Sequence, residues 1–85
     1  MIDQKYILES VAGLPPREKA AAIAHWVYVL AKRKEPDWEL RVPESWDDLP
    51  SSAKQYNLSS IDVWAENPEL LAAWLNALEQ VTDAE

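Results

Sequence analysis

The sequence contains no cysteine and no phenylalanine, and among its 85 residues it has one glycine and one histidine. Without cysteine, disulfides, thiolate metal sites and cysteine nucleophiles are excluded, although this absence is neutral about compartment. The single Gly13 excludes the glycine-rich loops that bind phosphates and dinucleotides, because those motifs need several glycines. A chain of this length predicts one domain over 1–85 with a modest core.

Membrane and targeting signals are also missing. The longest apolar run, 20–31, is interrupted by His25 and is shorter than the roughly 20 residues that cross a bilayer. The first five residues lack the basic start and the apolar stretch of a secretory signal. We therefore expect a cytoplasmic protein that does not bind a membrane.

Groups that carry out catalysis or bind metals are few. His25 has no acidic residue three or four positions away, and it lies in the most apolar segment of the chain, which favours a structural role. The acidic residues of 35–48 lack the central glycine of a calcium-binding EF-hand loop. We expect no enzyme, no cofactor and no metal, and an enzyme that uses His25 stays open as an alternative.

Charge is distributed unevenly along the chain. Residues 1–34 carry six basic and three acidic side chains, whereas 35–85 carry two basic and twelve acidic ones, and the net charge is −7. This asymmetry indicates that the acidic part faces either the basic part or a basic partner. The net charge repels nucleic acid, and Lys32, Arg33 and Lys34 are interpreted as cations at the end of a helix. We expect a basic protein partner and no direct nucleic-acid binding.

Capping residues and prolines predict an all-α fold, a small single-domain bundle of about four to five helices. Asp3 is predicted to cap the first helix, and Gly13 to follow it in a left-handed conformation. Ser52 with Gln55 and Ser59 with Asp62 fit capping boxes, which predicts two separate short helices. Asn67 is predicted to cap the last helix. The first predicted helix ends near 11, and the second runs from 15–16 to about 34. The third ends near 57, and the last two cover 60–66 and 68–81.

Two of these helices have apolar stripes at helical spacing. In the second helix the stripe predicts the core face and consists of Ala20, Ile23, Ala24, Val27, Leu30 and Ala31. Trp26, Tyr28 and Val29 lie off that stripe, so this helix is either central to the domain or shared with another chain. In the last helix the stripe consists of Leu70, Leu71, Trp74, Leu75, Leu78 and Val81. A structural subunit, or a homodimer built on the second or the last helix, is therefore an alternative function.

Residues 35–50 combine three prolines, two tryptophans and six acidic residues, which predicts a loop between the second and third helices. Trp38 and Trp46 either anchor in a partner or fold back on the helices. Our leading hypothesis is a non-enzymatic inhibitor whose acidic face imitates nucleic acid and occupies a basic, nucleic-acid-binding surface of a partner protein. The predicted partner-binding residues are Asp37, Trp38, Glu39, Glu44, Trp46, Asp47, Asp48, Asp62, Glu66 and Glu69.

The segment that runs from Leu14-Pro15-Pro16 into Ala22–Arg33 is similar to the first helix of some small bacterial antitoxins, over about a quarter of the chain. In its type, as a small, acidic, helical and cysteine-free chain, the protein resembles the antitoxins and phage anti-defence proteins that neutralise basic enzymes of nucleic acids. The resemblance implies an inhibitor. The rest of the chain departs from that pattern, since it ends in a predicted helix where such antitoxins often end in an extended tail.

Overall fold

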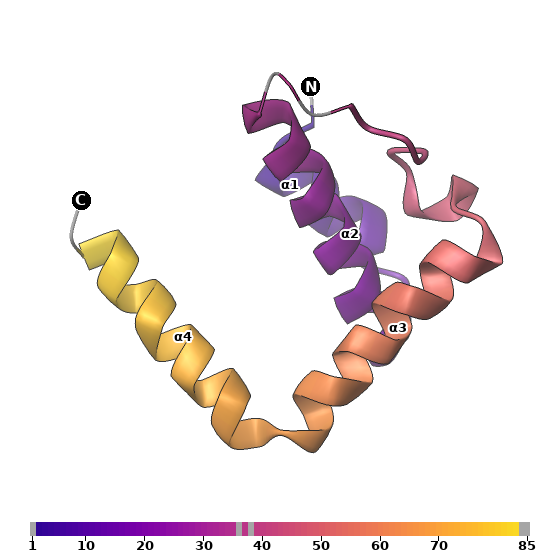
Figure 1. The fold of residues 1–85 in the computed structure, drawn as a ribbon. Coiled ribbons are helices and arrows are strands. Elements are labelled where there is room, and N and C mark those ends of the chain that lie inside the picture. Colours follow the sequence, from indigo (N-terminus) through magenta and orange to yellow (C-terminus); the bar gives the residue numbers. More distant parts are fainter. Residues whose placement is uncertain (1, 36, 38, 84–85) are drawn as a thin grey trace.

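The computed structural model describes residues 2–35, 37 and 39–83, and in these residues it contains helices and loops but no strand (Figure 1). The elements are α1 (Gln4–Val11), α2 (Pro16–Lys34), the short 3-10 helix η1 (Trp46–Asp48), α3 (Ser51–Glu66) and α4 (Pro68–Asp83). The all-α prediction is confirmed. The short η1 within the loop was not predicted.

Local sequence signals account for the ends of the first two helices. Asp3 caps α1, because its Oδ1 accepts a hydrogen bond from the Tyr6 amide at 2.8 Å. Helix α2 begins with proline at its start and ends with three cations in its last turn, as predicted. The prediction for Gly13 is wrong, since this residue has no positive φ and α1 ends in a right-handed Ala12.

Helix α3 is continuous, so the prediction of two short helices over this segment is wrong. The predicted caps Ser52 and Ser59 both lie inside α3, and polar side chains near the expected break bond back along the helix. Ser60 Oγ donates to the Tyr56 carbonyl at 3.1 Å, and Asn57 Nδ2 donates to the Ala53 carbonyl at 3.0 Å. A serine or asparagine that bonds to the preceding turn is compatible with a helix interior, which explains why the helix does not break here.

The connection between α3 and α4 is made by Asn67, although not as predicted. Its Nδ2 donates to the Val63 carbonyl at 2.7 Å, so the side chain satisfies the end of α3. Its main-chain carbonyl accepts the amides of Leu70 and Leu71 at 3.0 and 3.2 Å and starts α4. One residue therefore serves both helices, through its side chain for α3 and through its backbone for α4.

The core lies where α1, α3 and η1 meet α2. The buried face of α2 is formed by Ala21, Ala22, His25, Trp26 and Val29. Of the predicted stripe, Ile23 and Leu30 pack against this core but are only partly buried, and Val27 is 59% exposed. Small alanines on this face let the neighbouring helices approach closely, while the Trp26 ring packs edge-on against Tyr6 with centroids 5.8 Å apart. Both faces of α2 are apolar, so spacing alone did not identify the buried one. The rest of the core is contributed by Ile7, Val11, Trp46 and Leu49.

Helix α4 extends from the domain as an arm. In Figure 1, α3 and α4 form a V that opens away from their connection, and the C-terminal end of α4 lies apart from α1 and α2. The Cα radius of gyration is 13.9 Å, whereas a compact domain of this length has about 12 Å. No residue of α4 is buried. The arm therefore leaves most of its surface to solvent.

Candidate binding surface

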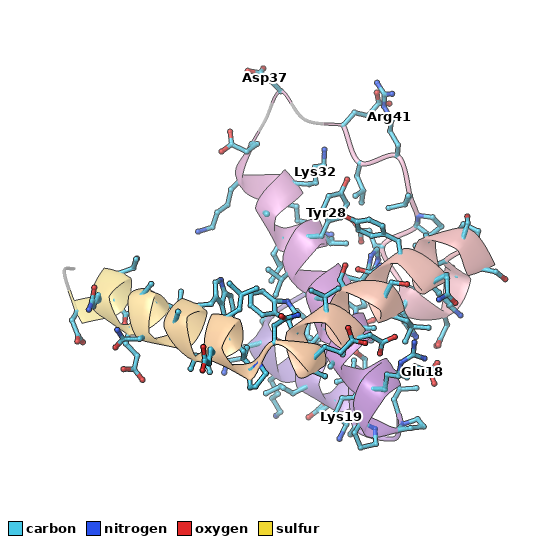
Figure 2. All side chains as sticks on the ribbon, turned by 60° about the horizontal axis from the view of Figure 1, so that its bottom comes forward. Glu18, Lys19, Tyr28, Lys32, Asp37 and Arg41 are labelled. Atoms are coloured by element: carbon cyan, nitrogen blue, oxygen red, sulfur yellow. The ribbon has the colours of Figure 1, made fainter. Side chains whose placement is uncertain are left out.

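The predicted acidic residues lie in two separate groups. The first is on the segment between α2 and α3: Asp37 and Glu39 are exposed in the loop, Glu44 lies before η1, and Asp47 and Asp48 belong to η1. The second is at the far end of α3 and the start of α4, and consists of Asp62, Glu66 and Glu69. Figures 1 and 2 show the loop around Asp37 on the side of the molecule opposite the α3–α4 connection. The structure does not bring the eight carboxylates together on one face.

Two of these carboxylates are paired with arginines of the basic half. Arg17 Nε and Nη2 donate to the two oxygens of Asp62 at 2.8 and 2.7 Å, and Arg33 Nη2 donates to Glu44 Oε1 at 2.7 Å. Hydrogen bonding to Arg17 lowers the pKa of Asp62 and raises the pKa of Arg17. Part of the charge asymmetry is thus neutralised within the chain. Among the described residues, no ion pair is formed by Asp37, Asp47, Asp48, Glu66 or Glu69.

The two tryptophans of the predicted site are placed differently. Trp46 is 4% exposed and belongs to the core, where its Nε1 donates weakly to Glu18 Oε1 at 3.4 Å. The ammonium group of Lys54 lies 5.6 Å from the centre of its ring. The ring of Trp46 therefore has folded back on the helices and offers no surface to a partner. Trp38 lies outside the described residues.

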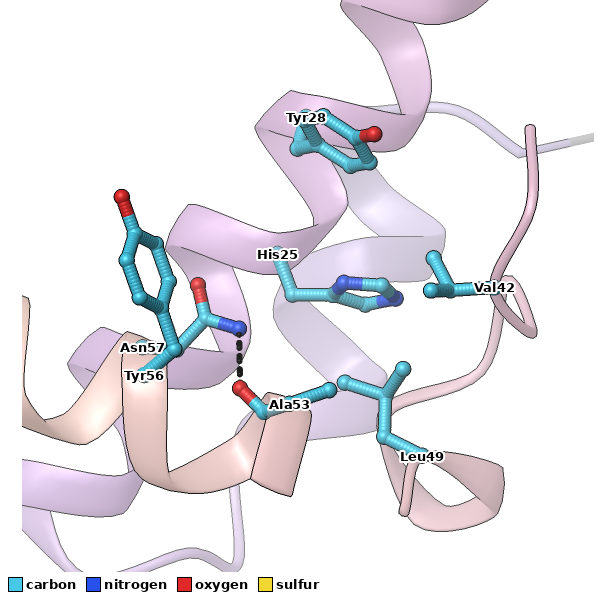
Figure 3. A pocket seen from close by; sticks show the side chains of 7 residues that line it. All are labelled: His25, Tyr28, Val42, Leu49, Ala53, Tyr56 and Asn57. Carbon is cyan, nitrogen blue, oxygen red and sulfur yellow. Dashed lines mark hydrogen bonds between the residues drawn. The ribbon is translucent and has the colours of Figure 1, made fainter. Parts of the chain in front are cut away.

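His25 fastens the loop to α2. It is 2% exposed, and its Nε2 lies 3.1 Å from the Pro43 carbonyl and 2.9 Å from the Glu44 carbonyl. Since both partners are acceptors, Nε2 carries the proton. Beside the imidazole is a half-open pocket of about 310 Å³ (Figure 3), with a mainly aliphatic and aromatic lining that includes Tyr28 and Tyr56 and one amide, that of Asn57. No carboxylate lines this pocket to orient the imidazole for acid–base chemistry.

No group of three or more metal-ligating side chains occurs in the part of the chain that the structure describes. The same residues contain no helix with the length and apolar character that a membrane span requires.

Helix α4 carries an apolar surface that the rest of the described chain leaves largely uncovered. Five large side chains on one side of it are each 45–59% exposed: Leu70, Trp74, Leu75, Leu78 and Val81. With the partly buried Leu71 they form the apolar α4 face. Together the five side chains expose roughly 500 Å², which is near the upper limit for the largest apolar patch of a typical monomer. Trp74 packs on Trp64 of α3 with ring centroids 5.6 Å apart, so this face is on the inner side of the V.

Two carboxylates flank the start of this face. Glu66 and Glu69 line an open hollow at the α3–α4 connection together with Leu70 and Ala73. The polar side chains further along α4, such as Glu79 and Asp83, fall on the other side of a helix with 3.6 residues per turn. The face is therefore apolar along its length and acidic at one end.

The apolar stripe of α4 was predicted, but its residues were not among the predicted partner-binding residues. The sequence nevertheless contains a signal that an apolar face stays exposed. Helix α2 is apolar on two faces and α4 on one, and the chain has few other elements to cover these surfaces. An excess of apolar faces over available neighbours indicates that one of them stays exposed.

The comparisons with known proteins give no match: no protein-family model, no curated protein and no solved structure matches this chain.

Proposed function

We propose that this protein is a non-enzymatic binding module that docks a protein partner on the apolar α4 face. The observation that carries the proposal is that five large apolar side chains of α4 are half exposed on one side, while α4 contributes no buried residue. Most helical stability in proteins comes from packing an amphipathic face, and an isolated helix of this length is marginal in water. A partner that covers the face would supply the packing that α4 lacks.

The size of the face indicates what the partner must contribute. Burying roughly 500 Å² of apolar surface yields a gross gain of about 12 kcal/mol, at about 25 cal/mol per Å². Association costs an estimated 4–15 kcal/mol before side-chain ordering is included. The face alone therefore holds a partner weakly, and stable binding requires that the partner bring a comparable apolar surface.

The test is affinity capture from native extract with the tagged chain, comparing wild type with the double variant Leu75→Gln and Leu78→Gln. Ala72→Gln is the matched control, because Ala72 is exposed on the same helix and outside the apolar α4 face. The expected result is a protein captured by wild type and by the control at both low and high salt, but lost with the double variant. Capture by the double variant at the wild-type level would contradict the proposal. Circular dichroism checks that the variants remain helical.

A second candidate function follows from the carboxylates that lack an internal cation. We propose, as this alternative, an inhibitor of the antitoxin type whose exposed acids occupy a basic, nucleic-acid-binding surface of a partner protein. Asp47 and Asp48 are exposed on η1, and no described cation pairs with them. Such binding gains mainly in association rate and specificity from charge, and it weakens as salt screens the charges.

Charge reversal tests the alternative. Asp47→Lys with Asp48→Lys is expected to abolish capture of a basic partner, and the same partner is expected to be released from wild type by high salt. The control is Glu9→Lys, which reverses an exposed acidic residue in the basic half. A partner that is still captured at high salt, and by the variant with lysine at positions 47 and 48, does not bind through these acids.

A further inference from the structure

We infer that the pocket beside His25 binds a small, neutral aromatic molecule of about two fused rings, which donates one hydrogen bond to the imidazole. The pocket volume of about 310 Å³ lies at the lower end of the range for small-molecule sites in proteins. A cavity of about 150 Å³ holds one benzene ring, so this volume suits two fused rings. The lining comes from α2, α3 and the segment between them, so the inference is independent of the apolar α4 face.

The polar atom that indicates a ligand is Nδ1 of His25. This residue is 2% exposed, and its Nε2 is used by the Pro43 and Glu44 carbonyls, whereas Nδ1 has no hydrogen-bond partner among the described residues. Nδ1 still touches solvent, because no described side-chain nitrogen or oxygen is both sealed from solvent and without a partner. Since His25 lines the pocket, this nitrogen is open to a molecule bound there.

The free polar atoms of the pocket require a hydrogen-bond donor. A neutral imidazole that carries its proton on Nε2 presents Nδ1 as an acceptor. Asn57 Nδ2 donates to the Ala53 carbonyl at 3.0 Å (Figure 3), which leaves Asn57 Oδ1 as a second acceptor. An N–H or O–H of a ligand satisfies such an acceptor, whereas an ether or carbonyl oxygen does not.

The lining disfavours a charged ligand. No lysine, arginine, aspartate or glutamate lines the pocket. Glu44 contacts His25 through its carbonyl, but its carboxylate accepts a hydrogen bond from Arg33 at 2.7 Å. A charged group that entered the pocket would therefore lose hydration without gaining an ion pair, and a neutral molecule avoids that cost.

The walls of the pocket favour a flat ring. The imidazole and the Tyr28 ring are inclined by 30° with centroids 6.5 Å apart, and Figure 3 shows one above the other beside α2. Val42 and Leu49 add aliphatic groups to the lining. Aromatic rings pack against each other with offset or edge-to-face geometry, so a flat ligand gains contacts here that a flexible chain does not.

The test is an NMR titration of the full chain with indole at about pH 8, where a histidine imidazole is neutral. Because His25 is the single histidine, its two ring nitrogens give unambiguous nitrogen-15 signals. Indole should shift the Nδ1 signal more than the Nε2 signal, with a dissociation constant of about 0.1–1 mM for so small a ligand. Benzofuran has the same shape but an ether oxygen in place of the N–H, and it should bind about 3- to 10-fold more weakly.

A matched pair of variants tests the location. Ala53→Leu adds bulk inside the pocket and removes none of the His25 hydrogen bonds. Ala65→Leu makes the same change at an exposed position of the same helix outside the pocket. Indole should bind Ala65→Leu as it binds wild type and should bind Ala53→Leu at least about 10-fold more weakly. The His25 signals of each free variant show whether the imidazole keeps its place, and if it moves, the comparison of indole with benzofuran on wild type decides.

Three results would overturn the inference. They are an Nδ1 signal that does not move at several millimolar indole, equal binding of indole and benzofuran, and undiminished binding by an Ala53→Leu variant whose imidazole is undisturbed. N-acetyltryptophanamide represents a tryptophan side chain of a protein, and its two amides should weaken its binding in a half-open pocket. If it binds as tightly as indole, the assignment to a free small molecule is wrong. None of these outcomes decides the capture experiment on the apolar α4 face.

Discussion

Two tryptophans of this chain occupy opposite environments, and replacing each one by alanine tests that assignment. Trp46 is 4% exposed in the core, whereas Trp74 is 51% exposed on the apolar α4 face. If Trp46 holds the core together, Trp46→Ala should destabilise the monomer severely. Trp74→Ala should leave the folded monomer in place, because α4 lies outside the core.

The structure sets the expected magnitudes. Removing a fully buried tryptophan costs about 3–5 kcal/mol, and a domain of 85 residues has a free energy of unfolding of about 4–13 kcal/mol in total. Trp46→Ala should therefore remove a large share of the stability. Trp74 has only about half of its surface covered, largely by Trp64, so Trp74→Ala should cost about 1–2 kcal/mol.

Urea unfolding followed by far-ultraviolet circular dichroism measures both free energies, at a protein concentration low enough to keep the chain monomeric. Trp46→Phe serves as the conservative control, because it keeps an aromatic ring in the core while it shortens the side chain's ring system and loses the weak hydrogen bond to Glu18. The reasoning is refuted if Trp46→Ala costs less than about 1 kcal/mol, or less than Trp74→Ala. Either result would mean that Trp46 does not hold the core.

Three further predictions concern local interactions. The hydrogen bonds from Arg17 lower the pKa of Asp62, so this pair stabilises the fold above the ordinary pKa of aspartate and loses that effect as the pH falls through the lowered value. Arg17→Met should move the NMR titration midpoint of the Asp62 carboxyl upward. An unchanged midpoint would contradict the assignment. His25→Ala removes the hydrogen bonds to the Pro43 and Glu44 carbonyls. It should lower the free energy of unfolding by about 1–3 kcal/mol and speed tryptic cleavage after Arg41. An unchanged cleavage rate would contradict this prediction. Gly13→Ala should stabilise by about 0.4–1 kcal/mol in thermal unfolding, because Gly13 has no positive φ and an added Cβ meets no atom within 4 Å.

The start of α1 and both ends of α2 could be predicted, because they depend on neighbouring residues. Asp3 bonds to an amide three residues on, and the proline at the start of α2 needs no partner elsewhere. The failure at Asn67 also has a local origin. An asparagine can serve either as a cap or, as here, as a donor to the preceding turn, and sequence does not distinguish the two.

The buried face of α2 was not predictable in the same way, because both of its faces are apolar. The choice between them is made by tertiary packing: Tyr6 from α1 meets Trp26, and the loop carbonyls meet His25. The lone histidine lies on the buried face for this reason. A polar residue in an apolar helix marks the buried face when the chain supplies backbone acceptors for its side chain. Here the acceptors are the carbonyls of Pro43 and Glu44, eighteen and nineteen residues away.

The candidate site shows the same division between local and tertiary information. The excess of acid in the second half was visible in the sequence, but its pairing was not: Arg17 reaches Asp62 and Arg33 reaches Glu44 only after folding, which leaves fewer free carboxylates than the charge count suggests. The apolar stripe of α4 was predicted residue by residue, and the structure adds that nothing in the described chain covers most of it. An apolar stripe predicts that a helix packs, and the open V leaves most of that packing unmade within the residues that the structure describes.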